Sequence, residues 1–399
     1  MTDWIEIVRL GARGDGVTAD GRFVAATVPG DRVRFTDPPE VEPGPAHATP
    51  PCRHFPECGG CQMQHVGDAA YVDWVAARMQ SALSAARVPV GAWEPVALSP
   101  PRSRRRASLR AVKRGSQLTL GFNAEASHRI VDIRECHVLL PELFALVAPL
   151  RRVLGALLKD GQGAGVSLTA SDTGVDILLA GVAAERLADI EQLNTFAQTC
   201  DIARFSVENG RGVETLVEAR PPLIRFGGVP VLLPPAPFLQ ATRDGEAALQ
   251  APVSGACVDA RTVADLFCGL GTFALPLSAA ARVHAIDSDR DAAAALKAAA
   301  HGRAMLVDHR DLFRHPLTVD ELAVFDAVVF DPPRAGAAAQ VAMLAASRVP
   351  KIVAVSCNPN TFARDAATLT QGGYRLERLW PVAQFRWSTH VELVASFRR

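Results

Sequence analysis

The sequence predicts an α/β protein whose C-terminal domain is a doubly wound, mainly parallel sheet closed by antiparallel terminal strands. From residue 261 onward, five runs of buried, β-branched residues alternate with helical patterns, which is typical of βαβ units. Two further strand-like segments, 375–379 and 391–397, have no full helix between them, so we expect them to pair antiparallel. The C-terminal domain, assigned to residues 241–399, is therefore expected to be Rossmann-like.

The N-terminal region predicts a small β-barrel. Short strand-like runs separated by glycines lie at residues 5–8, 22–25 and 32–35. This pattern is typical of a compact, oligonucleotide-binding type of barrel. We assign residues 1–45 to the barrel, and residues 46–66 to a proline-rich linker that also carries three cysteines.

A middle α+β domain is expected between these two regions, over residues 67–240. A helical pattern occupies 68–88, and further helices are expected near 142–159 and 184–198. Strand-like runs lie at 118–122, 165–169, 175–179 and 204–207.

Composition excludes some classes of protein. The chain has 399 residues, of which 49% are hydrophobic, so wholesale disorder is not expected. No apolar run reaches the ~18 residues of a spanning helix, and the N-terminus does not resemble a signal peptide. We expect a cytoplasmic monomer with no membrane partner.

Net charge is zero, yet the basic residues are unevenly placed. Between Glu94 and Glu125 there is no acidic residue. Seven basic residues occupy that stretch: Arg102, Arg104, Arg105, Arg106, Arg110, Lys113 and Arg114. Such a run indicates either an RNA contact or a solvated strand face.

Cys357 is the most informative residue. It follows the buried run 351–356 and precedes Asn358-Pro359, with a helix expected to begin at Thr361. Ligands bind at this edge of open α/β sheets. Helix N-terminal amides stabilise a thiolate, so we expect a nucleophile here rather than an inert buried cysteine.

A glycine-containing loop, Gly269-Leu270-Gly271, follows the first strand of the C-terminal domain, and Asp287 ends the second. An acidic side chain at that place can bind ribose hydroxyls. The third glycine of a dinucleotide fingerprint is missing. The pattern therefore favours S-adenosylmethionine over a nicotinamide cofactor.

Two further carboxylates end strands of the same domain. Asp331 precedes Pro332-Pro333-Arg334, whose prolines fix the loop. Glu392 lies in an otherwise apolar strand, where desolvation would raise its pKa and suit a general base. Without the other motifs, Glu392 would be interpreted as a solvent-facing residue of an edge strand.

Three cysteines crowd into ten residues, and a distant fourth could complete a site that binds a metal ion or an iron–sulfur cluster. They are Cys52, Cys58, Cys61 and Cys136. Their spacing is not that of a paired zinc ribbon, and the sequence leaves both kinds of site open.

Together these motifs resemble the RNA uridine-5-methyltransferase family, most closely its cluster-containing members that modify 23S ribosomal RNA. The resemblance covers most of the chain and implies an RNA-binding TRAM barrel at 1–45. It makes Cys357 the nucleophile and Glu392 the base. It assigns a [4Fe-4S] cluster to the four cysteines named above. It places S-adenosylmethionine contacts at Gln240, Phe267, Gly269, Thr272, Asp287, Asp311 and Asp331.

Three positions depart from the family pattern. Asp287 stands where many relatives have Glu, and Thr272 replaces an Asn of some members. The run 385–389, Phe-Arg-Trp-Ser-Thr, differs from the usual Phe-Pro-x-Thr. These departures bear on the cofactor contact and on the geometry of the substrate loop.

The chemistry accounts for the residue types. Addition of a thiolate to carbon 6 of uracil makes carbon 5 nucleophilic, and a base must later remove the carbon-5 proton. Four alternatives stay open: transfer RNA as the substrate, RNA cytosine-5 methylation, a non-catalytic RNA-binding or ribosome-assembly factor and, more distantly, an NAD-linked enzyme.

Overall fold

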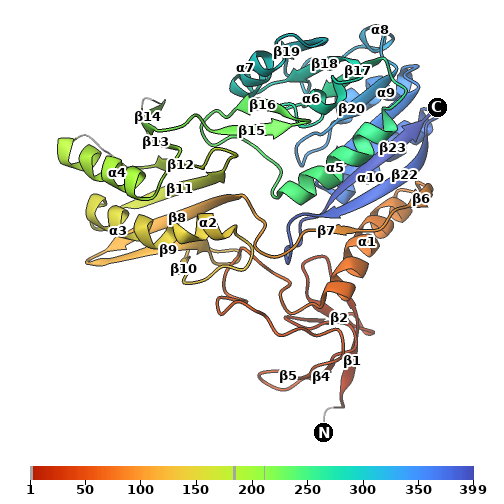
Figure 1. Ribbon diagram of the computed structural model, residues 1–399. Helices are drawn as coiled ribbons and strands as arrows, with labels where there is room; N and C mark the ends of the chain where they lie inside the picture. The colour runs from red at the N-terminus through yellow and green to blue at the C-terminus, as the bar shows by residue number, and fades with distance from the viewer. Residues whose placement is uncertain (1–2, 183–185, 211) are drawn as a thin grey trace.

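The computed structural model describes residues 3–182, 186–210 and 212–399. Figure 1 shows three parts: a small N-terminal sheet, a central sheet with helices packed against it, and a large C-terminal sheet. Within the described residues, no helix is long and apolar enough to cross a membrane.

The N-terminal sheet is antiparallel, with strand order β3-β2-β1-β4-β5. Its strands are β1 (Ile5–Leu10), β2 (Gly16–Thr18), β3 (Phe23–Val24), β4 (Arg32–Arg34) and β5 (Glu40–Glu42). Ile7, Val24 and Val33 form a small core between them. The three predicted strands are confirmed.

The central sheet has seven strands in the order β10-β9-β8-β11-β12-β13-β14, and only β12 and β13 are parallel. The strands are β8 (Arg106–Arg114), β9 (Gln117–Asn123), β10 (Ile130–Asp132), β11 (Gly163–Ala170), β12 (Val175–Ala180), β13 (Arg204–Asn209) and β14 (Gly212–Glu218). The predicted α+β class of this region is confirmed.

Three helices cover the central sheet: α2 (Pro141–Ala145), α3 (Val147–Leu157) and α4 (Leu187–Thr199). The helical structure predicted near 142–159 is present, but the chain breaks at Leu146 into α2 and α3. Pro149 explains the break, since proline is tolerated in the first turn of a helix but not in its interior. The helix predicted near 184–198 begins at Leu187, and residues 184–185 lie outside the described residues.

The C-terminal sheet follows the order β19-β18-β17-β20-β21-β23-β22-β6, and β7 also pairs with β22. Its strands are β17 (Thr262–Leu266), β18 (Arg282–Asp287), β19 (Met305–His309), β20 (Ala327–Phe330), β21 (Lys351–Ser356), β22 (Arg375–Ala383) and β23 (Glu392–Arg398). The first five are parallel to their neighbours, and β23 runs antiparallel between β21 and β22. The Rossmann-like class is confirmed.

Apolar helix faces and both faces of this sheet form two large cores. The helices of the C-terminal region are α5 (Arg243–Ala256), α6 (Ala274–Leu277), α7 (Arg290–Ala299), α8 (Val319–Leu322), α9 (Ala338–Ala346) and α10 (Pro359–Gln371). The hairpin of β15 (Leu223–Phe226) and β16 (Val229–Leu232) packs against this region.

The sheet also takes in residues from the region expected to be the middle domain. Strands β6 (Val90–Trp93) and β7 (Ala97–Leu98) pair in parallel with β22, and α1 (Asp68–Ala85) packs against α10 and β22. The apolar residues of α1, among them Tyr71, Trp74 and Met79, need a partner surface, and the face of β22 and α10 provides it. The domain bounds at 67 and 240 stay predictions.

Candidate active site

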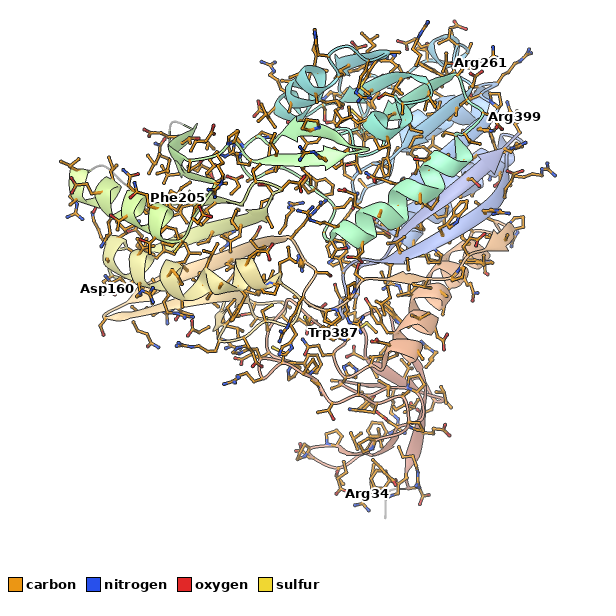
Figure 2. All side chains as sticks on the ribbon, in the orientation of Figure 1. Arg34, Asp160, Phe205, Arg261, Trp387 and Arg399 are labelled. Carbon is orange, nitrogen blue, oxygen red and sulfur yellow. The ribbon has the colours of Figure 1, made fainter. Side chains whose placement is uncertain are left out.

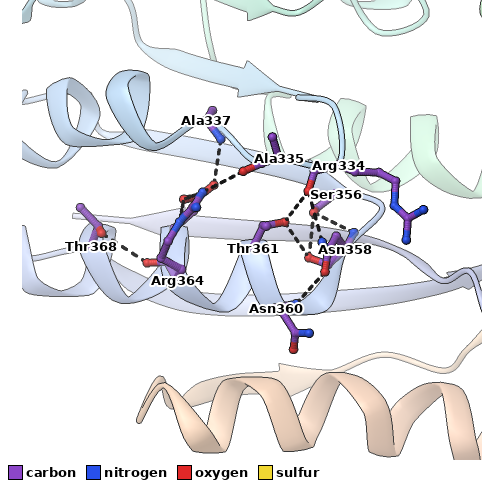
Figure 3. A network of polar contacts seen from close by, with 10 residues as sticks. Arg334, Ala335, Ala337, Ser356, Asn358, Asn360, Thr361, Arg364 and Thr368 are labelled. Atoms are coloured by element: carbon purple, nitrogen blue, oxygen red, sulfur yellow. Dashed lines mark hydrogen bonds and ion pairs between the residues drawn. The ribbon is translucent and has the colours of Figure 1, made fainter. Parts of the chain in front are cut away.

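Cys357 lies at the carboxyl end of β21, beside the first turn of α10. The Asn358 side chain caps α10, since its Oδ1 accepts a hydrogen bond from the backbone N–H two residues on (3.1 Å). Its Nδ2 donates to the Arg334 carbonyl at 3.2 Å, which ties the loop after β20 to the loop after β21 (Figure 3). The helix begins at Pro359 and not at Thr361, because proline suits the first helical position and asparagine is a strong cap.

The Cys357 side chain is a thiol in this structure. Burial, followed by the charges of Glu392 and Asp331, raises the pKa of Cys357 to about 11, while Arg334 acts in the opposite direction. The sequence predicts that the helix N-terminus favours the thiolate, and these carboxyl groups act in the opposite direction. Burial and two carboxyl groups outweigh the helix, whose first turn already has the Asn358 cap.

Glu392 begins β23 and is 6% exposed. Burial and the charge of Asp331 raise the pKa of Glu392 to about 8, whereas a hydrogen bond from Gln384 and the charge of Arg334 act to lower it. The predicted rise in pKa is confirmed. A solvent-facing edge position is excluded, because β23 lies between β21 and β22.

The cofactor residues predicted from the glycine loop gather at the carboxyl ends of β17 and β18. Phe267 and Gly269 both have positive φ, 61° and 51°, so the chain turns sharply away from β17. The Asp287 carboxylate accepts hydrogen bonds from the Gly269 N–H and the Asp289 N–H, both at 2.7 Å. These two bonds fix the carboxylate beside the loop, where a ribose would be bound.

The remaining predicted cofactor residues surround this edge. The Gln240 Nε2 donates to Asp331 Oδ2 at 3.4 Å. Thr272 lies in the loop before α6, and its carbonyl accepts a hydrogen bond from Gln250. Asp311 follows β19, and its Oδ1 accepts the backbone N–H of Phe313 at 2.9 Å.

Asp265 was not among the predicted residues. It lies within β17, is fully buried, and among the described residues neither carboxylate oxygen has a hydrogen-bond partner. Burial and the nearby charge of Asp331 raise its pKa well above the usual value. The signal was present in the sequence, since Asp265 is the one charged residue in the buried run 262–266.

This edge fits S-adenosylmethionine. Burial, followed by the charge of Asp287, raises the pKa of Asp331 to about 7, and burial also raises that of Asp265 although the Ala274 backbone N–H acts to lower it. Two such desolvated carboxyls favour a cationic ligand, because a nearby positive charge offsets their burial. A Cβ added at Gly269 would meet open space, so the loop leaves room beside Asp287.

A cleft of about 810 Å³ opens between the central and C-terminal sheets. Cys357, Glu392, Gln240 and Arg334 line it from the C-terminal side and from the segment before α5. From the central side it is lined by strands β8, β9 and β11. The structure thus brings the predicted nucleophile, base and one cofactor residue into one cleft, with the other cofactor positions on the adjoining sheet edge.

The basic run 102–114 is not a single exposed patch. Arg105 is 1% exposed and pairs with Glu246, while its Nε donates to the Gln240 carbonyl. Arg105 immediately precedes β8, and successive side chains of an extended chain point to opposite faces, so Arg105 faces away from Arg106. The arginines that line the cleft are Arg104, Arg106 and Arg110.

The four cysteines of the predicted cluster line a second, smaller cavity, although Cys136 is far from the others in sequence. None is in a disulfide, and burial raises the pKa of each thiol, that of Cys61 to about 12. Across the described ranges, no three His, Cys, Asp or Glu side chains lie close enough together to hold a single metal ion.

Comparison with known proteins identifies close relatives. Residues 256–398 match the family model described as tRNA (Uracil-5-)-methyltransferase. The chain is 46% identical to an uncharacterized RNA methyltransferase of Zymomonas mobilis, with 99% of each chain covered. It is 30% identical to the 23S rRNA (uracil(1939)-C(5))-methyltransferase of Aeromonas salmonicida, over 94% of this chain and 91% of that one.

A solved structure has the same fold throughout. The tRNA (uracil-54, C5)-methyltransferase of Pyrococcus abyssi, in complex with S-adenosyl-L-homocysteine, superposes with a TM-score of 0.79 at 22% identity. The superposition covers 99% of each chain.

Proposed function

Because this chain belongs to the S-adenosylmethionine-dependent RNA (uracil-5-)-methyltransferase family, we propose that it methylates carbon 5 of one uridine in RNA through a transient bond from Cys357 to carbon 6. The observation that supports this most is that Cys357 and Glu392 line one cleft. The two groups also interact electrostatically, since Glu392 contributes to the raised pKa of Cys357.

In the proposed reaction, the Cys357 thiol gives its proton to solvent and the sulfur adds to carbon 6, and the electrons of the 5,6 double bond move onto the carbonyl oxygen at carbon 4. Carbon 5 then takes the methyl group. S-adenosylmethionine, when bound, would supply that methyl group as an electrophile and be left as S-adenosylhomocysteine. Glu392 removes the carbon-5 proton, the double bond re-forms, and the Cys357 sulfur leaves.

The cofactor would be held at the edge already described. We assign the ribose hydroxyls to Asp287 and the cationic part of the cofactor to Asp331 with Gln240. Phe267, Gly269, Thr272 and Asp311 complete the assigned set.

RNA would enter through the cleft. Arg106 and Arg104 stack over the rings of Phe238 and Phe385, and Phe238 is 71% exposed. Arginine–aromatic pairs suit single-stranded RNA whose bases are splayed from their stack. We propose 23S ribosomal RNA as the substrate, as the name of the 30% identical relative suggests. We also propose that the protein acts as a monomer in the cytoplasm.

The four cysteines would hold a [4Fe-4S] cluster. A four-iron cube is larger than one ion, so its thiolates stand farther apart around a common cavity. The observation that supports this assignment is that Cys52, Cys58, Cys61 and Cys136 line one small cavity.

The test of the proposed function uses RNA that lacks the modification. Total RNA from a strain deleted for this gene is incubated with the enzyme and methyl-labelled S-adenosylmethionine, and the nucleosides are then analysed. We expect label in 5-methyluridine from 23S RNA. Label in transfer RNA would overturn the ribosomal assignment, and label in 5-methylcytidine would overturn the choice of base.

A second arm tests the covalent step. RNA containing 5-fluorouridine should form a stable adduct with the enzyme, because fluorine cannot be removed as a proton. Normal RNA affinity with no adduct and no label would instead identify a non-catalytic RNA-binding factor.

A further inference from the structure

A buried glutamine connects the cofactor edge with Glu392. Gln384 follows β22, is 3% exposed, and was not singled out by the sequence. Its Oε1 accepts a hydrogen bond from the Ala241 backbone N–H at 2.8 Å. Its Nε2 donates to Gln240 Oε1 at 2.6 Å. Val382, two residues earlier on β22, pairs with Glu392 on β23, and the Gln384 amide lies near enough to lower the pKa of the Glu392 carboxyl as a hydrogen-bond donor would.

The direction of this chain of hydrogen bonds is fixed by the backbone. A backbone N–H can only donate, so the atom of Gln384 that faces Ala241 must be the amide oxygen. The Gln384 nitrogen is then left to donate to Gln240 and to Glu392. Because Gln240 accepts with its oxygen, its own nitrogen faces Asp331, and the carboxyls at both ends of the chain face amide donors.

The packing around Gln384 leaves it little freedom. A Cβ added at Gly245, in the first turn of α5, would lie 2.5 Å from the Gln384 Cβ and 3.1 Å from its Oε1. Glycine at this place therefore makes room for Gln384. The amide is pressed between α5 and the end of β22, which holds it in one orientation.

We propose that Gln384 is a positioning residue for methyl transfer: it orients the Glu392 carboxylate for proton removal and joins it, through Gln240, to the cofactor carboxyl Asp331. This inference rests on the proposed function, since it gives Gln384 a role only if Glu392 is the base. It adds a residue to that mechanism. It also explains how the proposed base, Glu392, and the cofactor carboxyl, Asp331, keep a fixed position relative to each other.

The step that Gln384 supports is the last one. The Glu392 carboxylate takes the proton from carbon 5, and the electrons of that C–H bond form the 5,6 double bond. The bond between carbon 6 and the Cys357 sulfur breaks, and its electrons go to sulfur. A donor to Glu392 is strongest when the carboxylate is charged, so Gln384 favours the form that can accept the proton.

Other charged groups face Glu392 as well. Asp331 disfavours its carboxylate and Arg334 favours it, and the Cys357 thiol adjoins it. On its own segment lies His390, and across the cleft lie Arg104 and Arg106. Gln384 is the neutral donor in this group, so replacing it tests hydrogen bonding without removing a charge.

The test compares Gln384→Glu and Gln384→Met with the wild-type enzyme. The glutamate variant keeps the oxygen that accepts from Ala241 but loses the donor, and it places a second carboxyl beside Glu392. Like charges disfavour ionisation. In single-turnover methylation, we expect the pH midpoint to rise by about one unit, with a rate about tenfold lower at pH 7 that recovers at alkaline pH.

The methionine variant loses donor and acceptor with no new charge, so its midpoint should rise by less. Gln340→Met is the matched control: Gln340 is fully buried and makes two hydrogen bonds to the Leu317 backbone, remote from the cleft. It should lower the melting temperature while leaving the pH midpoint unchanged. A shift in the Gln384 variants alone supports positioning.

Two results separate failure of this inference from failure of the proposed function. If the wild-type enzyme forms no adduct with 5-fluorouridine RNA, the covalent function is wrong. If wild type and Gln384→Glu both form the adduct but both Gln384 variants keep the wild-type pH midpoint, only the role of Gln384 is wrong. Should Gln384→Glu fail to fold by circular dichroism, the same comparison is decided by Gln384→Met.

Discussion

The two thiol sites of this protein are built in different ways. Cys357 stands at the end of a regular strand, and its charged neighbours are Glu392, Asp331 and Arg334. The four cysteines at the second cavity come from irregular segments, and their thiols adjoin one another and the Arg104 guanidinium. Both sites have buried thiols with raised pKa values, so burial alone does not distinguish a nucleophile from a set of ligands. The neighbours do.

The segment 385–390 lies between the two sites. The Trp387 carbonyl accepts hydrogen bonds from the backbone N–H groups of Gln62 and Met63, at 2.8 and 2.9 Å. Its side chain packs with Cys61 and Cys136, and Figure 2 shows it where the parts of the molecule meet. Ser388 and His390, farther along the same segment, line the cleft together with Glu392 at the start of β23. The sites are thus neighbours in structure, and the question is whether they differ in function.

The largest effect is expected at the catalytic thiol. Cys357→Ala should lower methylation by at least about 10³-fold, because removal of a covalent nucleophile abolishes the route itself. RNA affinity, measured by filter binding, and iron content should stay at wild-type values. Full turnover by this variant would remove Cys357 from the mechanism and erase the contrast between the two sites.

The pH dependence tests the carboxyl beside that thiol. Because burial raises the pKa of Glu392 to about 8, the base is mostly protonated, and inactive, below pH 8. Its active fraction, and kcat/KM with it, should rise by about tenfold per pH unit well below pH 8, and by about 50-fold in all from pH 6 to 8. The Glu392→Gln variant, which cannot titrate there, is the control. A flat wild-type profile over this range would contradict the assignment of Glu392.

The cofactor edge should give a smaller effect. Asp287→Ala removes hydrogen bonds from a charged acceptor, worth about 1.5–3 kcal/mol, so affinity for S-adenosylmethionine should fall about 10- to 100-fold. Isothermal titration calorimetry measures this directly. The control is Asp287→Glu, which keeps the carboxylate and should bind within about threefold of wild type. If Asp287→Ala binds S-adenosylmethionine as tightly as the wild-type protein does, Asp287 does not bind the ribose.

Sequence patterns predicted the catalytic edge because its residues end regular strands, whose carboxyl ends must meet at one edge of a parallel sheet. Cys357 and Asp331 are examples. Gln384 could not be predicted, since its partners depend on where residue 241 crosses the end of β22. The same holds for β6 and β7, whose place beside β22 follows from long-range pairing.

For the basic run 102–114, the sequence showed the charge but not which of its side chains are buried. Its charge was evident, but the fold divides it between a buried ion pair at Arg105 and the cleft-facing Arg104 and Arg106. A positive residue in a strand has two possible environments, and only the packing of α5, which carries Glu246, decides between them. The local charge therefore indicated a basic surface, but it did not identify which arginines line the cleft.

The smallest catalytic effect is expected at the second thiol site. Cys136→Ser removes one of the four proposed ligands, so iron should fall from about four to below about one per chain in anaerobically purified protein. Because Cys357 and Glu392 lie on the sheet and not in the cysteine segments, adduct formation with 5-fluorouridine RNA should fall less than about tenfold. Cys200→Ser, remote from both sites, should keep its iron. If Cys136→Ser instead loses adduct formation as completely as Cys357→Ala, the two sites do not function independently. The contact of Trp387 with Cys61 and Cys136 would then connect the cysteine site with the cleft.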